Sequence, residues 1–285
     1  MLFDPFKQKL SECVFTESDY YLMLLDLAIN RTKYTNTPKG IDIRYLEKTL
    51  TENGACILFK NDGKGEFPVE KYPFLCLPLA NEYRLDSYGE PLSRSAIGVN
   101  HTYTGLNSDN SVIMYNNRLH SSSIPMLRWY STRMYKATTN ADANIDMQRY
   151  SVIVKAREKT RLSFLNAIKK FQLGLPFIFS TADSSISQKD FETLNFNIPY
   201  VADKCFSYNR ELWNECLTRL GIDTLNINKK ERLLDSEVDS QKSSIEIYRQ
   251  SYLNERKEAV KKFNEIFGAD WGVEWYNGPL YNDFE

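Results

Sequence analysis

The chain has 285 residues, 42% of them hydrophobic, which is enough for a sizeable core in one large domain or a few small ones. Lysine and arginine number 36 against 37 aspartate and glutamate, a balance that excludes the global basic excess of proteins that grip nucleic acid tightly. The five cysteines lack paired short spacing and only two histidines are present, which indicates neither a disulfide framework nor a zinc cluster.

The first part of the chain predicts two helices followed by a β-rich region. SDYYLMLLDLAINR (18–31) begins with a capping residue and is apolar on more than half of its circumference, which predicts a helix buried between other elements. A shorter helix is expected from about 42 to 52, before the strand-like ACILFK (55–60). From 55 to 117, β-branched and aromatic runs alternate with turn residues, including a hairpin turn at 62–65. This region predicts a small antiparallel barrel or sheet.

A longer helix is expected next. The serines at 121–123 stand before Pro125, and this order marks a helix start because serine caps free amides and proline is tolerated in the first turn. The helical pattern weakens between 138 and 144, where we expect the helix to fade.

The following residues predict a small α/β lobe. A strand at 150–155, a helix at about 159–172 and a strand at 176–180 give a compact β-α-β order. Cationic residues gather on this lobe, among them Lys155, Arg157, Lys169 and Lys170. By charge pattern alone, such a surface can equally be a solubilising face.

The junction between 204 and 241 is the most informative stretch. In LWNECLTRLGI (212–222), apolar residues fall on one helical stripe, and Gly221 predicts a left-handed C-cap. The apolar stripe consists of Leu212, Trp213, Cys216, Leu217 and Leu220. The charged segment that follows interleaves Lys229, Lys230 and Arg232 with Glu231, Asp235, Glu237 and Asp239. This composition cannot bury itself, so a solvated loop is expected before a last long helix at about 245–266, which Gly268 closes.

The chemistry of an enzyme is not indicated. No convergent set of acid, base, nucleophile or metal ligands stands out. Gly63-Lys64-Gly65 lacks the spacing of a phosphate-binding loop, and His101 and His120 have no cysteine or acid at ligand spacing. No apolar run approaches the roughly 18 residues of a membrane span. We therefore expect a soluble protein without cofactor, metal site or catalytic activity.

Several motifs resemble the portal proteins, or upper-collar head–tail connectors, of small podoviruses of the phi-29 type. The resemblance covers roughly residues 20 to 268. The motifs are RYLEKTL (44–50), VIMYNN (112–117), IPMLRWY (124–130), IPYVADK (198–204), the LWNE helix with its Gly-Ile ending, the KKER loop and NEIFG (264–268).

The resemblance implies an α+β, mainly helical fold with a helical stem, an α/β clip, a β-rich wing and a C-terminal helix. The implied segments are N-terminal wing helices at 1–54, the β-rich wing at 55–120, a stem helix at 121–149, the clip at 150–203, a second stem helix at 204–222, a channel loop at 223–241, and a crown or wing helix with the tail at 242–285.

The resemblance further implies a ring of twelve copies at one capsid vertex, assembled in the host cytoplasm and kept in the virion. Double-stranded DNA passes through the ring during packaging and ejection, without sequence readout. Capsid protein, a packaging ATPase and lower-collar or tail proteins are the implied partners. The clip is the docking surface for the ATPase and tail, through Lys155, Arg157, Lys169 and Lys170.

The resemblance also assigns roles to single residues. The implied DNA-facing cations are Lys204, Lys229, Lys230 and Arg232, and the implied channel-loop acids are Glu231, Asp235, Glu237 and Asp239. Trp213, Leu217 and Leu220 would pack between helices of the channel wall. The family's second lysine ring maps to Asn195, an uncharged residue. The basic N-terminal arm of the family is also absent, since MLFDPFKQKL carries only Lys7 and Lys9, so RNA binding is not carried over.

Two alternatives stay open from the residues. One is a head–tail adaptor or other structural assembly protein that never lines DNA, and the other is a nucleic-acid enzyme. Standing alone, the charged run at 228–241 is usually only a solvated surface loop.

Overall fold

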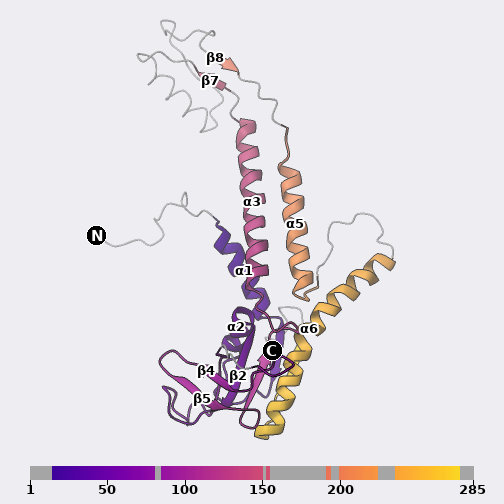
Figure 1. Cartoon of the computed structure of the whole chain (residues 1–285). Coiled ribbons are helices and arrows are strands. Elements are labelled where there is room, and N and C mark those ends of the chain that lie inside the picture. The colour runs from indigo at the N-terminus through magenta and orange to yellow at the C-terminus, as the bar shows by residue number, and fades with distance from the viewer. Residues whose placement is uncertain are drawn as a thin grey trace, which may run out of the picture. The chain divides into compact units, whose positions relative to one another are not determined.

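The computed structural model describes residues 15–80, 85–149, 152–154, 191–193, 199–223 and 235–276, and it shows a mixed fold of helices and short strands (Figure 1). The chain divides into two compact units. The first, which we call the main unit, comprises Met1–Tyr135 and Asn209–Glu285, and the second comprises Lys136–Tyr208.

The elements follow one another in this order along the described residues: α1 (Glu17–Ile29), β1 (Thr32–Thr35), α2 (Ile43–Asn53), β2 (Ala55–Lys60), β3 (Phe74–Pro78), β4 (Arg94–Ile97), β5 (Thr102–Leu106), β6 (Ser111–Tyr115), α3 (Ile124–Arg149), β7 (Val152–Val154), β8 (Phe191–Thr193), α5 (Ala202–Arg219), α6 (Asp235–Phe267) and β9 (Gly272–Trp275).

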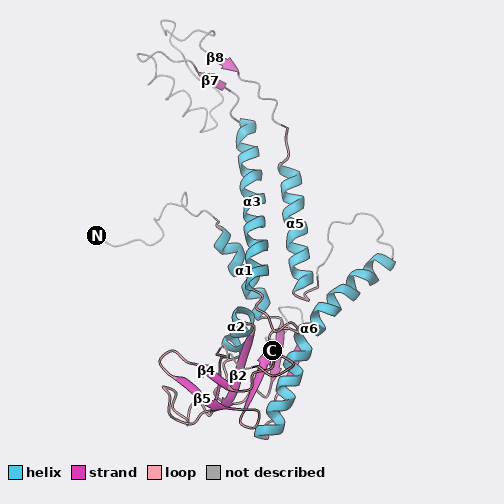
Figure 2. Cartoon of the chain, in the orientation of Figure 1, coloured by secondary structure: helices cyan, strands magenta, loops and turns pink. Residues whose placement is uncertain are grey.

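The strands pair antiparallel in small sheets (Figure 2). The largest of those described has the order β3-β2-β6, with Ile57 of β2 opposite Leu77 on one side and Ile113 on the other. Two-stranded sheets pair β1 with β9, β4 with β5, and β7 with β8. The prediction of an antiparallel β region at 55–117 is therefore confirmed.

Local capping explains where the first helices begin and end. At the start of α1, the Asp19 carboxylate accepts a hydrogen bond from the Thr16 N–H at 2.6 Å. Asp42 caps α2 by accepting from the Tyr45 N–H at 3.0 Å, and Gly54 ends this helix at φ +83°. Both predicted helices are confirmed to within a few residues.

Among the described residues, three apolar clusters hold the main unit together. The first lies between α2, one face of the β3-β2-β6 sheet and α6. The second joins α1, α3 and α5, and the third covers the other face of the sheet, with Ala96 of β4 and Tyr103 of β5. Since β2 alternates between the first and third clusters, its residues are buried on both faces, which explains why ACILFK is almost continuously apolar.

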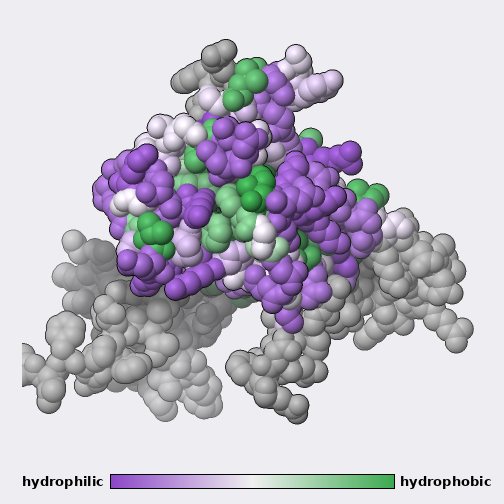
Figure 3. Space-filling model, turned by 90° about the horizontal axis from the view of Figure 1, so that it is seen from below, coloured by the Kyte–Doolittle hydropathy of each residue, from purple (hydrophilic) through white to green (hydrophobic). Residues whose placement is uncertain are grey.

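The underside of the described surface is mainly hydrophilic, with hydrophobic residues gathered in a small area near its middle (Figure 3). Several large apolar side chains of the main unit are exposed, and the most exposed are Tyr88 at 93%, Val99 at 91% and Leu119 at 85%. None of the described helices is both long and apolar enough to cross a bilayer.

The end of α3 differs from the end that its residue pattern predicted. The helix does not fade between 138 and 144 but continues to Arg149, which is the end that the resemblance implied. Within the second unit, Ala137 and Ala141 are buried on the same helix face, and Asn144 bonds the Pro199 carbonyl at 3.0 Å and the Val201 N–H at 2.9 Å. These contacts stabilise a stretch whose helix propensity is weak.

The connection between β2 and β3 is longer than the hairpin turn predicted at 62–65. Strand β2 does pair with β3, but the connection extends from Asn61 to Pro73. The Asn61 side chain holds this longer loop, because its Nδ2 donates to the carbonyls of Phe67 and Tyr72, both at 2.9 Å. Of the predicted α/β lobe, β7 confirms the first strand, and it pairs with β8, which was not predicted. The helix at 159–172 and the strand at 176–180 lie outside the described residues.

Candidate functional site

Helix α5 carries the first group of candidate residues. Leu212, Cys216 and Leu220 are buried against α1 and α3, as the stripe predicted. Trp213 is half-buried and packs on the same cluster, and Leu217 is half-buried. These contacts lie within one chain, and the packing of Trp213, Leu217 and Leu220 in a channel wall stays a proposal.

Lys204 lies in the first turn of α5 and is exposed. A cation at this end of a helix is slightly unfavourable against the macrodipole, so its position is not explained by helix stability. Its exposure leaves the ammonium free to meet an anionic partner.

The end of α5 is anchored on α6. Gly221 has φ +76°, and the N–H of Ile222 donates to the Leu217 carbonyl at 2.9 Å, which confirms the predicted left-handed C-cap. The Arg249 guanidinium donates to the Gly221 carbonyl at 3.2 Å and to the Asp223 carboxylate at 3.1 Å. The chain therefore leaves α5 from a point that is fixed on α6.

Part of the expected channel loop is helical. Asp235, Glu237 and Asp239 belong to the first turns of α6 rather than to a loop, which corrects the predicted boundary of 241. Acidic residue types are favoured at a helix N-terminus because they complement the macrodipole, and the mixed charge alone did not reveal this. Lys229, Lys230, Glu231 and Arg232 lie outside the described residues, as do Lys155, Arg157, Lys169 and Lys170 of the predicted docking surface.

A buried group of charges joins α6 to α2 and was missed from the sequence. Arg256 of α6 and Glu47 of α2 are both fully buried and form a two-pronged ion pair, Nε to Oε1 at 2.8 Å and Nη2 to Oε2 at 2.7 Å. Arg256 also donates to the carbonyls of Asn116 at 2.8 Å and Tyr252 at 2.9 Å. Arg31 stacks on the Tyr252 ring at 3.6 Å and donates to the Asn116 side chain at 3.1 Å.

This group extends to the start of α3. The Asn116 amide donates to the Ser123 hydroxyl at 2.9 Å, and the Ser123 N–H donates to the Thr51 carbonyl of α2 at 2.9 Å. Residues from α2, α6, the end of β6 and the start of α3 thus share one hydrogen-bonded network. The network therefore ties the start of α3 to α2 and to the end of β6.

The Glu47 carboxylate pairs with Arg256, and its charge also acts on the nearby guanidinium of Arg31. Burial by itself would raise the pKa of Glu47, but the charge and hydrogen bonds of Arg256 outweigh it and hold the pKa below its usual range. Burial and repulsion by Arg256 lower the pKa of Arg31. The Nε and Nη1 atoms of Arg31 have no hydrogen-bond partner among the described residues. The network therefore holds an excess positive charge that makes Glu47 indispensable to it.

A signal for this network existed in the sequence. Glu47 lies between Leu46 and Leu50 on the apolar face of a helix, and an acid in that position needs a buried cation. The partner lies 209 positions away, so no local pattern could identify it.

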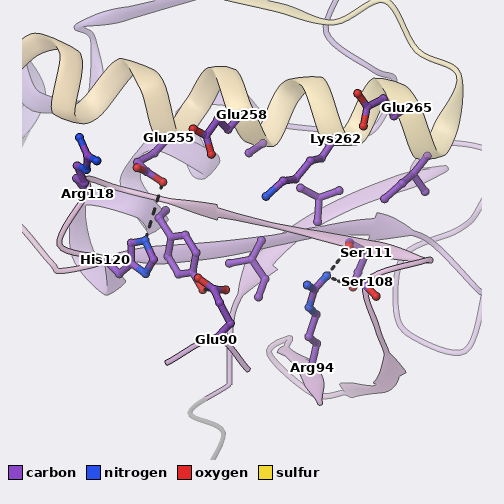
Figure 4. A pocket seen from close by; sticks show the side chains of 15 residues that line it. Glu90, Arg94, Ser108, Ser111, Arg118, His120, Glu255, Glu258, Lys262 and Glu265 are labelled. Atoms are coloured by element: carbon purple, nitrogen blue, oxygen red, sulfur yellow. Dashed lines mark hydrogen bonds and ion pairs between the residues drawn. The ribbon is translucent and has the colours of Figure 1, made fainter. Parts of the chain in front are cut away.

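A pocket of about 750 Å³ separates α6 from β6 and the loops near it (Figure 4). His120 stacks on Tyr115 at 3.5 Å and lies 3.9 Å from the Glu255 carboxylate, while the Tyr115 hydroxyl donates to Glu90 at 2.8 Å. Figure 4 shows Lys262 reaching from α6 toward the sheet. The pocket holds carboxylates and cations together.

The opposite wall of this pocket carries Arg94. It donates to the Ser111 carbonyl at 2.6 Å and to the Asn107 carbonyl at 3.2 Å. These acceptors fix the guanidinium without a carboxylate, so Arg94 braces the loop before β6. We find here no pairing of nucleophile and base that would support catalysis.

Two further features bear on catalysis in the described part of the chain, the groups that could hold a metal ion and the Cys216 thiol. No group of three or more His, Cys, Asp or Glu residues there has the arrangement of a metal site. Burial raises the pKa of the Cys216 thiol to about 12, which makes it unreactive.

Comparison with known proteins shows a family match that extends over nearly the whole chain. Residues 7–277 match the family model described as Phage Connector (GP10). Among solved structures, the portal and tail of native bacteriophage P68 is 16% identical over 99% of this chain and 94% of that chain, with a TM-score of 0.48. A HK97 family phage portal protein from Corynebacterium diphtheriae is 10% identical over 90% of this chain and 91% of that chain, with a TM-score of 0.43.

Proposed function

The chain belongs to the phage connector family, and from that premise we propose that twelve copies form a ring at one capsid vertex through which double-stranded DNA passes. As a connector, or portal, protein it is a structural component of the bacteriophage virion. The family match over residues 7–277 is the observation that carries the proposal.

In this ring, α3 and α5 form the channel wall. Lys204 is exposed on α5, and a ring repeats it once per subunit as a girdle of positive charge. Lys229, Lys230 and Arg232 would add further cations beside the neighbouring acids of the loop. The anchoring of Gly221 and Asp223 by Arg249 supports this role, because it fixes the point from which the loop starts.

The mixed charge of this region suits a duplex that slides. Each phosphate that a cation neutralises releases counterions, and six to ten such contacts change affinity by roughly 10³ to 10⁵ between low and moderate salt. Acidic residues between the cations keep the affinity for the DNA duplex low. The absence of a base-reading motif from the sequence means that no register on the duplex is preferred.

We further propose that the protein is not an enzyme and that a partner ATPase drives packaging. The sequence lacks a phosphate-binding loop, which is consistent with this division of labour. The clip region and its cations Lys155, Arg157, Lys169 and Lys170 would receive the ATPase first and the lower-collar or tail proteins afterwards, while the wing would contact the capsid protein.

Two experiments test this proposal. Images of the purified protein by electron microscopy should show closed rings with a bore wide enough for duplex DNA. A variant that lacks residues 229–238 should form the same rings, but particles built with it should lose packaged DNA. A solitary globule in the images would refute the ring, and full DNA retention by the deletion variant would refute the role of the loop. Rings that assemble in particles without DNA in the bore would favour a head–tail adaptor.

A further inference from the structure

A highly exposed leucine stands on a rigid turn between β6 and α3. Leu119 is 85% exposed. The Asn117 side chain holds its turn by accepting from the N–H groups of Leu119 at 3.0 Å and Ser121 at 3.2 Å. The Arg118 N–H donates to the Ser251 hydroxyl of α6 at 3.4 Å. Because the turn is already ordered, burying Leu119 against a partner costs little conformational entropy.

Helix α6 places a second apolar side chain and two carboxylates beside this leucine. Ile247 is 69% exposed, and with Leu119, Glu255 and Glu258 it lines a groove of about 540 Å³. Glu255 pairs with His120, whereas Glu258 has no ion pair with any described residue. We call Leu119, Ile247 and Glu258 the knob.

A second groove of about 440 Å³ lies on another flank of α6, and we call it the socket. Val260, Trp271 and Val273 form its apolar floor, and Lys257 and Lys261 stand exposed at its rim. Neither lysine has a carboxylate partner in the part of the chain that is described. Below the rim, the indole N–H of the buried Trp271 also lacks an acceptor among those residues.

The knob and the socket lie on neighbouring flanks of α6. At 3.6 residues per turn, Glu258 of the knob points about 100° from Lys257 and about 60° from Lys261 of the socket. Since the knob stands on a rigid turn and on α6 itself, a chain cannot insert its own knob into its own socket. A knob that fills the socket therefore belongs to another copy.

We propose that the knob of one copy inserts into the socket of the next copy, with Glu258 facing Lys257 and Lys261. The inference rests on the proposed ring and names a contact that closes it. A contact between two different patches forms a ring when the rotation between copies closes.

A second copy fits the socket better than nucleic acid does. The socket lining holds two lysines, Lys257 and Lys261, and one carboxylate, Glu265, so its excess positive charge matches the Glu258 carboxylate of the knob. The apolar floor matches Leu119 and Ile247. A phosphate backbone would satisfy the lysines but offers no apolar group for Val260 and Trp271. The combination of apolar and charged matches favours the second copy.

The test uses variants of the full chain, and the readout is the share of protein in rings, measured by mass photometry over a range of concentrations. L119D, E258K and the double variant K257E/K261E should each raise the concentration for half assembly by roughly tenfold or more. Combining E258K with K257E/K261E in one chain restores opposite charges across the contact, so assembly should return toward that of the wild type.

The matched control is V99D, because Val99 is 91% exposed on the β4–β5 hairpin and belongs to neither surface. V99D should assemble as the wild type does, and circular dichroism should show that every variant is folded. Wild-type protein without rings would overturn the proposed function. Rings that form normally in all knob and socket variants would overturn this contact alone. Normal rings with weaker DNA binding by K257E/K261E would assign the socket to DNA and contradict the proposal.

Discussion

At the scale of single residues, Glu47 is a buried carboxylate whose charge a hydrogen-bonded network of the main unit requires. It is fully buried, accepts both prongs of Arg256, and also accepts from the hydroxyls of Thr32 at 2.9 Å and Tyr34 at 2.6 Å. Removing its charge leaves Arg31 and Arg256 buried without a counter-charge. The stability lost in this way is larger than the stability lost when an exposed ion pair of the same helix is broken.

Glu47→Gln should therefore lower the free energy of unfolding by about 3 to 5 kcal/mol, measured by urea denaturation of the purified protein. Glu52→Gln is the matched control on α2, because Glu52 pairs with Lys48 only at the surface, at 3.9 Å. That variant should change stability by less than about 1 kcal/mol. Equal losses in the two variants would contradict the central role of Glu47.

The lowered pKa of Glu47 also predicts a dependence on acid. The folded protein holds this pKa below the value of about 4.3 that an unfolded glutamate has. The contribution to stability is therefore fully present above that value and is lost as the pH falls through the folded pKa. Urea denaturation between pH 7 and pH 3.5 should show a steeper loss for the wild type than for Glu47→Gln. Parallel curves would count against this assignment.

At the scale of elements, the connection from α5 to α6 depends on a glycine with two constraints. Gly221 has a positive φ, and a Cβ atom at this position would lie 2.9 Å from the Arg249 Cα and 3.1 Å from the Trp275 ring. Gly89, in the turn before β4, has φ +83° but open space around it. Substitutions at the two glycines can therefore be compared. Both require a residue with a side chain to adopt a positive φ, but only the substitution at Gly221 also brings a Cβ atom close to other atoms.

Gly221→Ala should consequently destabilise the protein more than Gly89→Ala does. The second change should cost roughly 1 to 2 kcal/mol for the left-handed conformation alone. The first adds the displacement of Arg249, whose backbone belongs to α6 and cannot move by itself. Thermal unfolding measures the difference, and equal midpoints for the two variants would show that α5 and α6 separate easily here.

At the scale of the whole molecule, different parts of the chain have different roles in the proposed ring. The knob and the socket belong to the main unit, whereas the proposed docking cations belong to the segment between α3 and α5. If these surfaces act independently, changes in one should leave the other intact.

Reversing Lys169 and Lys170 to glutamate should weaken docking of the packaging ATPase and leave ring assembly unchanged, because the charge that attracts the partner is inverted. Docking is measured by co-sedimentation of rings with the ATPase at two salt concentrations. The control reverses Lys39 and Lys60, two exposed lysines of the main unit. Unchanged docking by the first variant would mean that its lysines only solubilise the protein.

The sequence by itself determined the local features of this protein. The helices predicted at 18–31, about 42–52 and 204–222 and the cap at Gly221 follow from the period of apolar residues and from glycines at helix ends, such as Gly54 and Gly221. The β-rich region follows from its β-branched and aromatic runs. The family motifs likewise lie within short stretches and led to the connector family. Only the tertiary structure decided the pairing of Glu47 with Arg256 and the two grooves beside α6, because their residues come from distant parts of the chain. Contacts with residues 199–201 also stabilise the last turns of α3, which its own helix propensity would end earlier.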